Sequence, residues 1–411
     1  MKHKINVAHL TVGMYVTELD RPWTETPFLF QGFTIESDDD LTQLRELCDH
    51  VYILGDAPQL AKEKPAQTDL AKANSPEPAK AATDPSAQFL DRIRETTKLR
   101  DRSCALVTSV LKSVASEKKP DLAQIQDIVS ELIRANNSAQ DASLWLTMMR
   151  NDQHDATAVH GFNTAVIAIA LARLAKLPLK AMKSVGTAAL LHDVGKAKTP
   201  ASILYKAGPL SPQEFEIVRR HAADGYEALK SSEELPESTA EIIFSHHERL
   251  DGRGYPRGLS GTAINQEARI VMTAEVYDEL TNERVYHEAM APQQALALMR
   301  KQAKGHFGED MLQYFLDCLG NHPVGSLIQL DNGAMGVVIS HNKRRPTQPL
   351  VMLLRDQKGQ PLSDRPIVNL ALTNPTDKNS PSRILRALDA KKAGIDIAGE
   401  AKEMIEKSHH E

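Results

Sequence analysis

Cysteine is scarce in this chain. Among 411 residues there are three, Cys48, Cys104 and Cys318, which lie far apart and form no CxxC pair. This usage excludes a disulfide framework of the kind that stabilises small secreted proteins. It is typical of a reduced chain, and we expect a cytoplasmic protein.

Long apolar runs are lacking as well. No segment approaches the roughly 18 consecutive apolar residues that indicate a membrane-spanning helix, and the richest run, 165–172, is short and has a helical pattern. The N-terminus, Met1-Lys-His-Lys-Ile-Asn6, is not followed by an apolar stretch. The sequence therefore predicts neither a signal peptide nor insertion into a membrane.

The chain also lacks a surplus of basic residues, since its formal net charge is −5. Proteins that bind nucleic-acid polymers or membrane surfaces are usually basic. We therefore expect neither of these as a partner, while a local basic pocket for a small anion is compatible with the composition.

The remaining composition is that of an ordinary globular protein, with 41% hydrophobic and 25% charged residues. The length predicts two to four domains. Strand-like, polar and helical patterns alternate along the chain, and the helical connector is compatible both with a signalling arm and with the first helices of the next domain. The predicted divisions are an N-terminal α/β module (1–56), a disordered linker (57–86), a helical connector (87–140), a strongly helical domain (141–322), a small β extension (323–373) and a polar tail (374–411).

Histidine is the unusually frequent residue, since six of the fifteen fall between His154 and His247. An apolar helix ends by presenting His192 and Asp193, and Gly195 then lets the backbone turn. Neighbouring residues of a helix point about 100° apart, so both side chains reach one cleft only from the end of the helix. There, His192 would bind one metal and Asp193 would bridge two.

Further histidines lie at helix ends or on apolar helix faces. His160 precedes this pair, His221 follows a capping box that opens at Ser211 and Glu214, and His246-His247 ends the next helix. So many histidines in such positions are not easily explained as core residues. Imidazole together with carboxylate suits Fe, Mn, Zn, Ni or Co better than Mg or Ca.

At this point the sequence resembles the HD-GYP family of HD-superfamily phosphohydrolases, over residues 140–320. The N-terminal module resembles the uncharacterised module that often precedes such domains, and the β unit resembles their C-terminal extension. The implied fold is mainly α: an HD-type helical bundle with a small N-terminal α/β module and a small C-terminal β unit. The matching residues are His192-Asp-Val-Gly-Lys196, Ile203-Leu-Tyr-Lys-Ala-Gly208, His221, His246-His-Glu-Arg-Leu-Asp-Gly-Arg-Gly-Tyr-Pro256, Arg269-Ile270 and Asp278-Glu-Leu-Thr281.

The resemblance implies hydrolysis of cyclic di-GMP to pGpG, and in some members on to GMP. It implies two divalent metal ions, Fe or Mn, about 3.5–4 Å apart. Lys196 and Asp193 are the implied catalytic residues, with Lys196 adding positive charge near the phosphoryl group. The implied metal ligands are His160, His192, Asp193, His221, His246, His247 and one more acid.

Glu275 occupies the position of that last acid, where the family usually has Asp. It shares a helix face with Ala268, Val271 and Met272. An acid on an apolar face needs a partner, and a metal ion would be one. Because Glu is one methylene longer than Asp, it would bind with altered geometry or weaken one metal.

The loop Asp251-Gly-Arg-Gly-Tyr-Pro256 follows the second histidine pair. Its glycines permit close approach of the backbone to a ligand, and Arg253 and Tyr255 are then available to phosphate or guanine. The family also uses this loop to contact diguanylate cyclase domains. Arg284 matches a phosphate-binding Arg of the family, and His287 stands where the family often has Lys.

Some members bind a third metal through an acid shortly before the first histidine. Asp155 lies near that position, but Ala156 is the alternative aligned residue, so we expect two metals. Two other functions stay open: a catalytically weak nucleotide-binding or scaffold protein, motivated by Glu275 and His287, and a different HD-superfamily nucleotide phosphohydrolase. A homodimer also stays open.

Overall fold

The computed structural model divides into two compact units, Met1–Ala82 and Thr83–Glu411, which are described separately. The predicted linker lies almost wholly outside the described residues. The structure describes residues 2–20, 33–35, 38–54, 85–149, 154–206, 208, 210–230, 232–282, 289–320, 322–342, 345, 347–373, 381, 383–397, 399–400 and 403.

The smaller unit is a four-stranded antiparallel sheet with one helix and its own apolar core, which includes Val16, Ile35, Leu44 and Val51. The strand order is β1-β4-β2-β3. Its helix lies between the third and fourth strands along the chain. The elements are β1 (Lys2–Asn6), η1 (Val7–His9), β2 (Tyr15–Leu19), β3 (Phe33–Thr34), α1 (Asp38–Leu47) and β4 (His50–Leu54).

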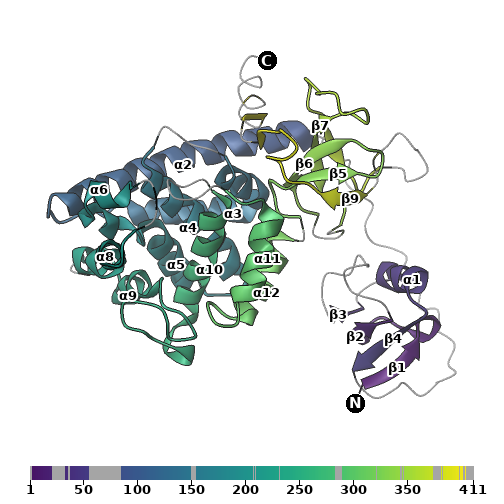
Figure 1. The fold of residues 1–411 in the computed structure, drawn as a ribbon, viewed down its shortest axis with the longest axis horizontal. Helices are drawn as coiled ribbons and strands as arrows, with labels where there is room; N and C mark the ends of the chain where they lie inside the picture. The colour runs from purple at the N-terminus through teal and green to yellow at the C-terminus, as the bar shows by residue number, and fades with distance from the viewer. Residues whose placement is uncertain are drawn as a thin grey trace, which may run out of the picture. The chain divides into compact units, whose positions relative to one another are not determined.

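The larger unit is mainly helical, and α4, α5 and α10 lie at its centre with α2 along one side (Figure 1). Buried residues of α2 and α3 belong to the same core as the later helices, so the connector forms the first helices of this unit. Its helices are α2 (Pro85–Ala115), α3 (Ile125–Thr147), α4 (Ala156–Leu174), α5 (Leu179–Leu191), η3 (Val194–Lys198), α6 (Ala201–Leu204), α7 (Pro212–Arg219), α8 (His221–Leu229), α9 (Glu237–Ser245), η4 (Gly261–Ala263), α10 (Gln266–Thr281), α11 (Pro292–Gln302) and α12 (Glu309–Leu319).

Helix α4 begins where the Asp155 carboxylate accepts hydrogen bonds from the backbone N–H groups of Thr157 and Ala158. It is long and apolar enough to cross a membrane by length and composition, but 78% of its apolar window is buried inside the protein. Such burial is that of a core helix. The predicted capping box of α7 is confirmed, because Ser211 and Glu214 each bond the other's backbone N–H.

A five-stranded antiparallel sheet follows the helices, in the order β8-β7-β6-β5-β9. Strand β9 comes from the segment predicted as a polar tail, so the sheet extends past residue 373. Its residues are half-exposed or exposed, and a short edge strand of this kind carries no clear apolar alternation. The predicted mainly helical fold with two small β-containing parts is confirmed. The strands are β5 (Leu327–Leu330), β6 (Met335–Ser340), β7 (Leu350–Arg355), β8 (Ile367–Asn369) and β9 (Ile384–Ala387).

Candidate metal centre

The seven donors predicted from the sequence come together in the larger unit, and six of them are buried. Most stand at helix ends, where a side chain can point along the axis into a shared space. Asp193 and three histidines form one group whose donor atoms all lie within 4.8 Å of one another: Asp193, His221, His246 and His247. The other three form a second such group: His160, His192 and Glu275.

Asp193 lies between the two groups. Its Oδ1 is 3.3 Å from Nε2 of His221 in the first group. Its Oδ2 is 3.5 Å from Nε2 of His192 and 3.7 Å from Nε2 of His160 in the second. One carboxylate oxygen therefore faces each group.

The histidine rings are held so that Nε2 faces the centre. Three of them donate Nδ1–H to the backbone carbonyl oxygen three residues earlier: His192 at 2.8 Å, His221 at 2.6 Å and His246 at 2.5 Å. His160 instead donates from Nδ1 to Oδ2 of Asp278, 2.6 Å away. Bonds of this kind fix the tautomer and orient the ring of a metal ligand.

The donor set fits divalent metal ions. Nε2 of His221 lies 3.2 Å from Nε2 of His246 and 3.0 Å from Nε2 of His247. Because His221 and His246 both donate from Nδ1, their neutral rings turn Nε2 lone pairs toward each other, and these repel unless a cation lies between them. Among the described residues, His192 Nε2 and Asp193 Oδ1 have no hydrogen-bond partner although both are buried. Each of these atoms would be satisfied by a metal ion.

Burial keeps four of the five histidines neutral. It lowers the pKa of His221 to about 4 and lowers the pKa of His192, His246 and His247 as well. Neutral imidazole is the form that binds a metal.

Lys196 is placed beside the acid of the cluster, with Nζ 2.5 Å from Oδ2 of Asp193. Burial raises the pKa of Asp193, but the positive charge of Lys196 beside it outweighs burial and holds that pKa well below the ordinary value. The acid is therefore ionised.

The predicted GYP loop packs on this cluster through Tyr255. Its backbone N–H donates to the carbonyl oxygen of His247 at 3.1 Å, and its ring stacks on that imidazole with centroids 4.6 Å apart. Arg253 is exposed, and among the described residues its guanidinium makes no contact with the cluster. Arg284 and His287 lie outside the described residues.

Three residues to which the sequence analysis assigned no role support the centre. Asp278 orients His160. Its position one helical turn after Glu275 is the feature of the sequence that could have indicated this role. Glu248 is fully buried and accepts hydrogen bonds from the backbone N–H groups of Arg257 and Leu259, both at 2.8 Å, which fixes the loop. Arg219 places its guanidinium 4.7 Å from the ring centroid of Tyr255, a contact that no local spacing indicates.

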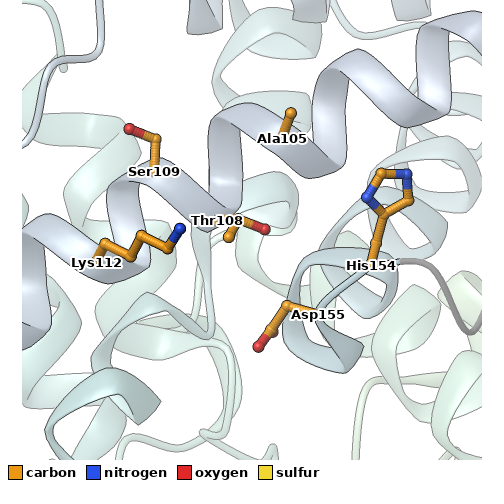
Figure 2. Close-up of a pocket in the computed structure, with 6 residues that line it drawn as sticks. All are labelled: Ala105, Thr108, Ser109, Lys112, His154 and Asp155. Carbon is orange, nitrogen blue, oxygen red and sulfur yellow. The ribbon is translucent and has the colours of Figure 1, made fainter.

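A separate hollow of about 330 Å³ lies between α2 and the turn before α4 (Figure 2). Its lining includes Asp155, the acid considered for a third metal. That carboxylate caps α4, and the neighbouring His154 lies 3.2 Å from Oδ1 of Asp101. These groups belong to neither of the two donor groups.

The chain matches three family models: "HD domain" over residues 110–311, "Domain of unknown function (DUF3391)" over 2–125 and "KOW domain associated with HD domain" over 327–392. It is 31% identical over 385 residues to cyclic di-GMP phosphodiesterase PA4108 of Pseudomonas aeruginosa, covering 92% of this chain and 91% of that protein. It is 36% identical over 144 residues to 3'3'-cGAMP-specific phosphodiesterase 1 of Vibrio cholerae, covering 35% and 33% of the two chains. Among solved structures, Bd1817, an HDG"Y"P protein from Bdellovibrio bacteriovorus, matches with 17% identity and a TM-score of 0.46, over 77% of this chain and 99% of that one.

The chain has a helical HD domain with a buried cluster of histidines and carboxylates. It is also similar to a phosphodiesterase along nearly the whole length of both chains. These features define a metal-dependent phosphodiester hydrolase. The chain belongs to the HD-GYP family.

Proposed function

We propose that this enzyme hydrolyses cyclic di-GMP to pGpG, with GMP as a further product, using two divalent metal ions. The observation that carries the proposal is Asp193, which turns one carboxylate oxygen toward each of two donor groups. Similarity to PA4108 over both chains supports the choice of substrate.

His221, His246 and His247 would hold one metal ion, and His160, His192 and Glu275 the other, with Asp193 shared. Imidazole and carboxylate donors suit Fe, Mn, Zn, Ni or Co, and the family resemblance favours Fe or Mn among these. When bound, two such ions supply Lewis acidity for the phosphate oxygens and lower the pKa of water. Asp155 is committed to capping α4, which supports two ions and not three.

Side chains of the protein would bind the substrate and stabilise its charge. Lys196 places a positive charge at the edge of the cluster, where the phosphate's negative charge grows during the reaction. Arg253, Tyr255, Arg284 and His287 are the proposed contacts to phosphate and guanine.

Reconstitution tests the proposal. Purified protein is loaded anaerobically with Fe(II) or Mn(II), its metal content is measured, and cyclic di-GMP is added with product analysis. We expect pGpG first, GMP later and about two ions per chain, with turnover lost in Asp193→Asn. Protein that holds two ions of either metal and leaves cyclic di-GMP intact would refute the proposal.

A second substrate class has a specific observation behind it, namely the similarity to a phosphodiesterase named for 3'3'-cGAMP. The same preparation should therefore be offered both cyclic dinucleotides. A kcat/KM for 3'3'-cGAMP above that for cyclic di-GMP would reassign the substrate.

A weakly catalytic binding or scaffold protein is the second candidate function. Glu275, in place of the Asp that the resemblance leads one to expect, favours it. Tight binding of cyclic di-GMP without product, by protein that holds both metals, would support this alternative.

The other parts of the chain have proposed roles as well. Residues 1–56 would act as a regulatory module, 141–322 as the catalytic domain and 323–373 as a β extension. The GYP loop would offer a surface to diguanylate cyclase domains, and a homodimer is a further candidate assembly. We propose a cytoplasmic location, which fractionation would test.

A further inference from the structure

One histidine of the cluster is held differently from the others. His160, His192, His221 and His246 each donate an Nδ1 hydrogen bond to an oxygen. Among the described residues, no such bond to Nδ1 of His247 is present. Its side chain is also 20% exposed, whereas the other donors are buried.

The Nε2 edge of the His247 ring lies 3.0 Å from Nε2 of His221 and 3.5 Å from Oε1 of Glu275. Away from that edge, what restrains the ring is stacking. The ring of Tyr255 lies 4.6 Å from it at an interplanar angle of 30°. Arg219 in turn places its guanidinium carbon 4.7 Å from the Tyr255 ring centroid. Tyr255 thus links the guanidinium to the imidazole, in an arrangement that a planar cation and an aromatic ring favour.

Arg219 is itself anchored. It is the last residue of α7, two residues before His221, and its Nη1 donates to Oε1 of Glu216 at 2.6 Å. Its side chain is about one-third exposed, at 31%. The neighbouring Arg220 is 74% exposed and has no ring contact among the described residues, and its nearest acid is Asp224 at 3.9 Å.

We propose that Arg219 is a positioning residue of the metal centre: acting through Tyr255, it holds the imidazole of His247 in the orientation in which Nε2 faces the first donor group. This inference rests on the proposed metal centre, in which His247 is a ligand. The stack takes the place of the Nδ1 hydrogen bond that orients the other rings. Loss of such an outer contact weakens metal binding by about 10–100-fold.

Metal affinity of the full-length apoprotein, measured by competition with a chelator for Mn(II), is the primary test. In Arg219→Ala we expect one of two sites to weaken by about 10-fold or more, with the other site and the melting temperature of the apoprotein unchanged. Arg220→Ala, the matched control, should keep both affinities.

Companion variants separate stacking from charge and from misfolding. Tyr255→Leu should reproduce the loss, and the double variant should lose no more than either single one, because both act on one contact. Tyr255→Phe keeps the ring and should bind metal like the wild type. Arg219→Lys keeps the charge but not the planar guanidinium, so it should recover only part of the affinity.

The outcomes are decisive in both directions. Wild-type metal affinity in Arg219→Ala, or a raised KM with unchanged metal affinity, would overturn the proposal, the second result making Arg219 a substrate contact. Failure of the wild type to hydrolyse cyclic di-GMP would remove the proposed function only, because metal affinity is measured without substrate.

Discussion

Two acids on α10, three residues apart, have different surroundings. Glu275 belongs to the donor group of His160 and His192. Asp278 accepts the Nδ1 hydrogen bond of His160 at 2.6 Å and also accepts from Asn282 at 2.7 Å. One helix turn therefore supplies both a candidate ligand and the group that orients its neighbour, a pairing typical of metal sites.

We predict that Glu275→Gln lowers the metal content of purified protein from two ions to about one per chain, because an amide oxygen replaces a charged donor. Turnover should fall with it, and elemental analysis after exhaustive dialysis measures the content. Glu275→Asp should keep two ions. Glu267→Gln, in the first turn of the same helix, is the control. Retention of both ions in Glu275→Gln would mean that this carboxylate is not a ligand.

At the scale of single residues, the sequence predicted the candidate metal donors but not the residues that hold them in place. All seven donors implied by the family resemblance lie in the two groups. Glu248 and Arg219 were not found, because their roles depend on contacts with loop residues that only folding brings close. Tyr255 was expected to be open to a ligand, yet its ring contacts His247 and Arg219.

Among the elements, η3 and α8 pack unusually closely, and this packing places Asp193 opposite His221. A Cβ at Gly195 would lie 1.9 Å from the carbonyl oxygen of His221 and 2.5 Å from the backbone nitrogen of Gly225. The chain leaves α5 and enters η3 around Gly195, as the sequence suggested, and the φ of Gly195 is not positive. The residue is glycine because two backbones touch there.

We predict that Gly195→Ala destabilises the larger unit by about 1–3 kcal/mol, the usual range for overpacking, and weakens metal binding by separating η3 from α8. Urea unfolding followed by circular dichroism measures the free energy. Gly225→Ala is the milder substitution in the same contact, since its Cβ would meet the backbone nitrogen of Gly195 at 3.3 Å and alanine favours its helix, so its loss should be smaller. Equal losses in the two variants would contradict this account of the packing.

At the scale of the whole molecule, the sequence predicted a mainly helical fold, and the helices at 87–140 prove to share the core of the helical unit. The last strand of the β unit was missed because β9 is short and half-exposed. Apolar periodicity reports burial against the rest of the chain, so it identifies core helices well and edge strands poorly.

The two units have separate apolar cores, and both donor groups belong to the larger one. Differential scanning calorimetry should therefore resolve two transitions. A ligand that binds only folded protein stabilises it by about 2.7 kcal/mol at 100 times its Kd, so Mn(II) should raise the melting temperature of the larger unit alone. In His221→Ala this shift should shrink, because a donor of the first group is gone. A single transition, or an equal shift in both, would mean that the units unfold together.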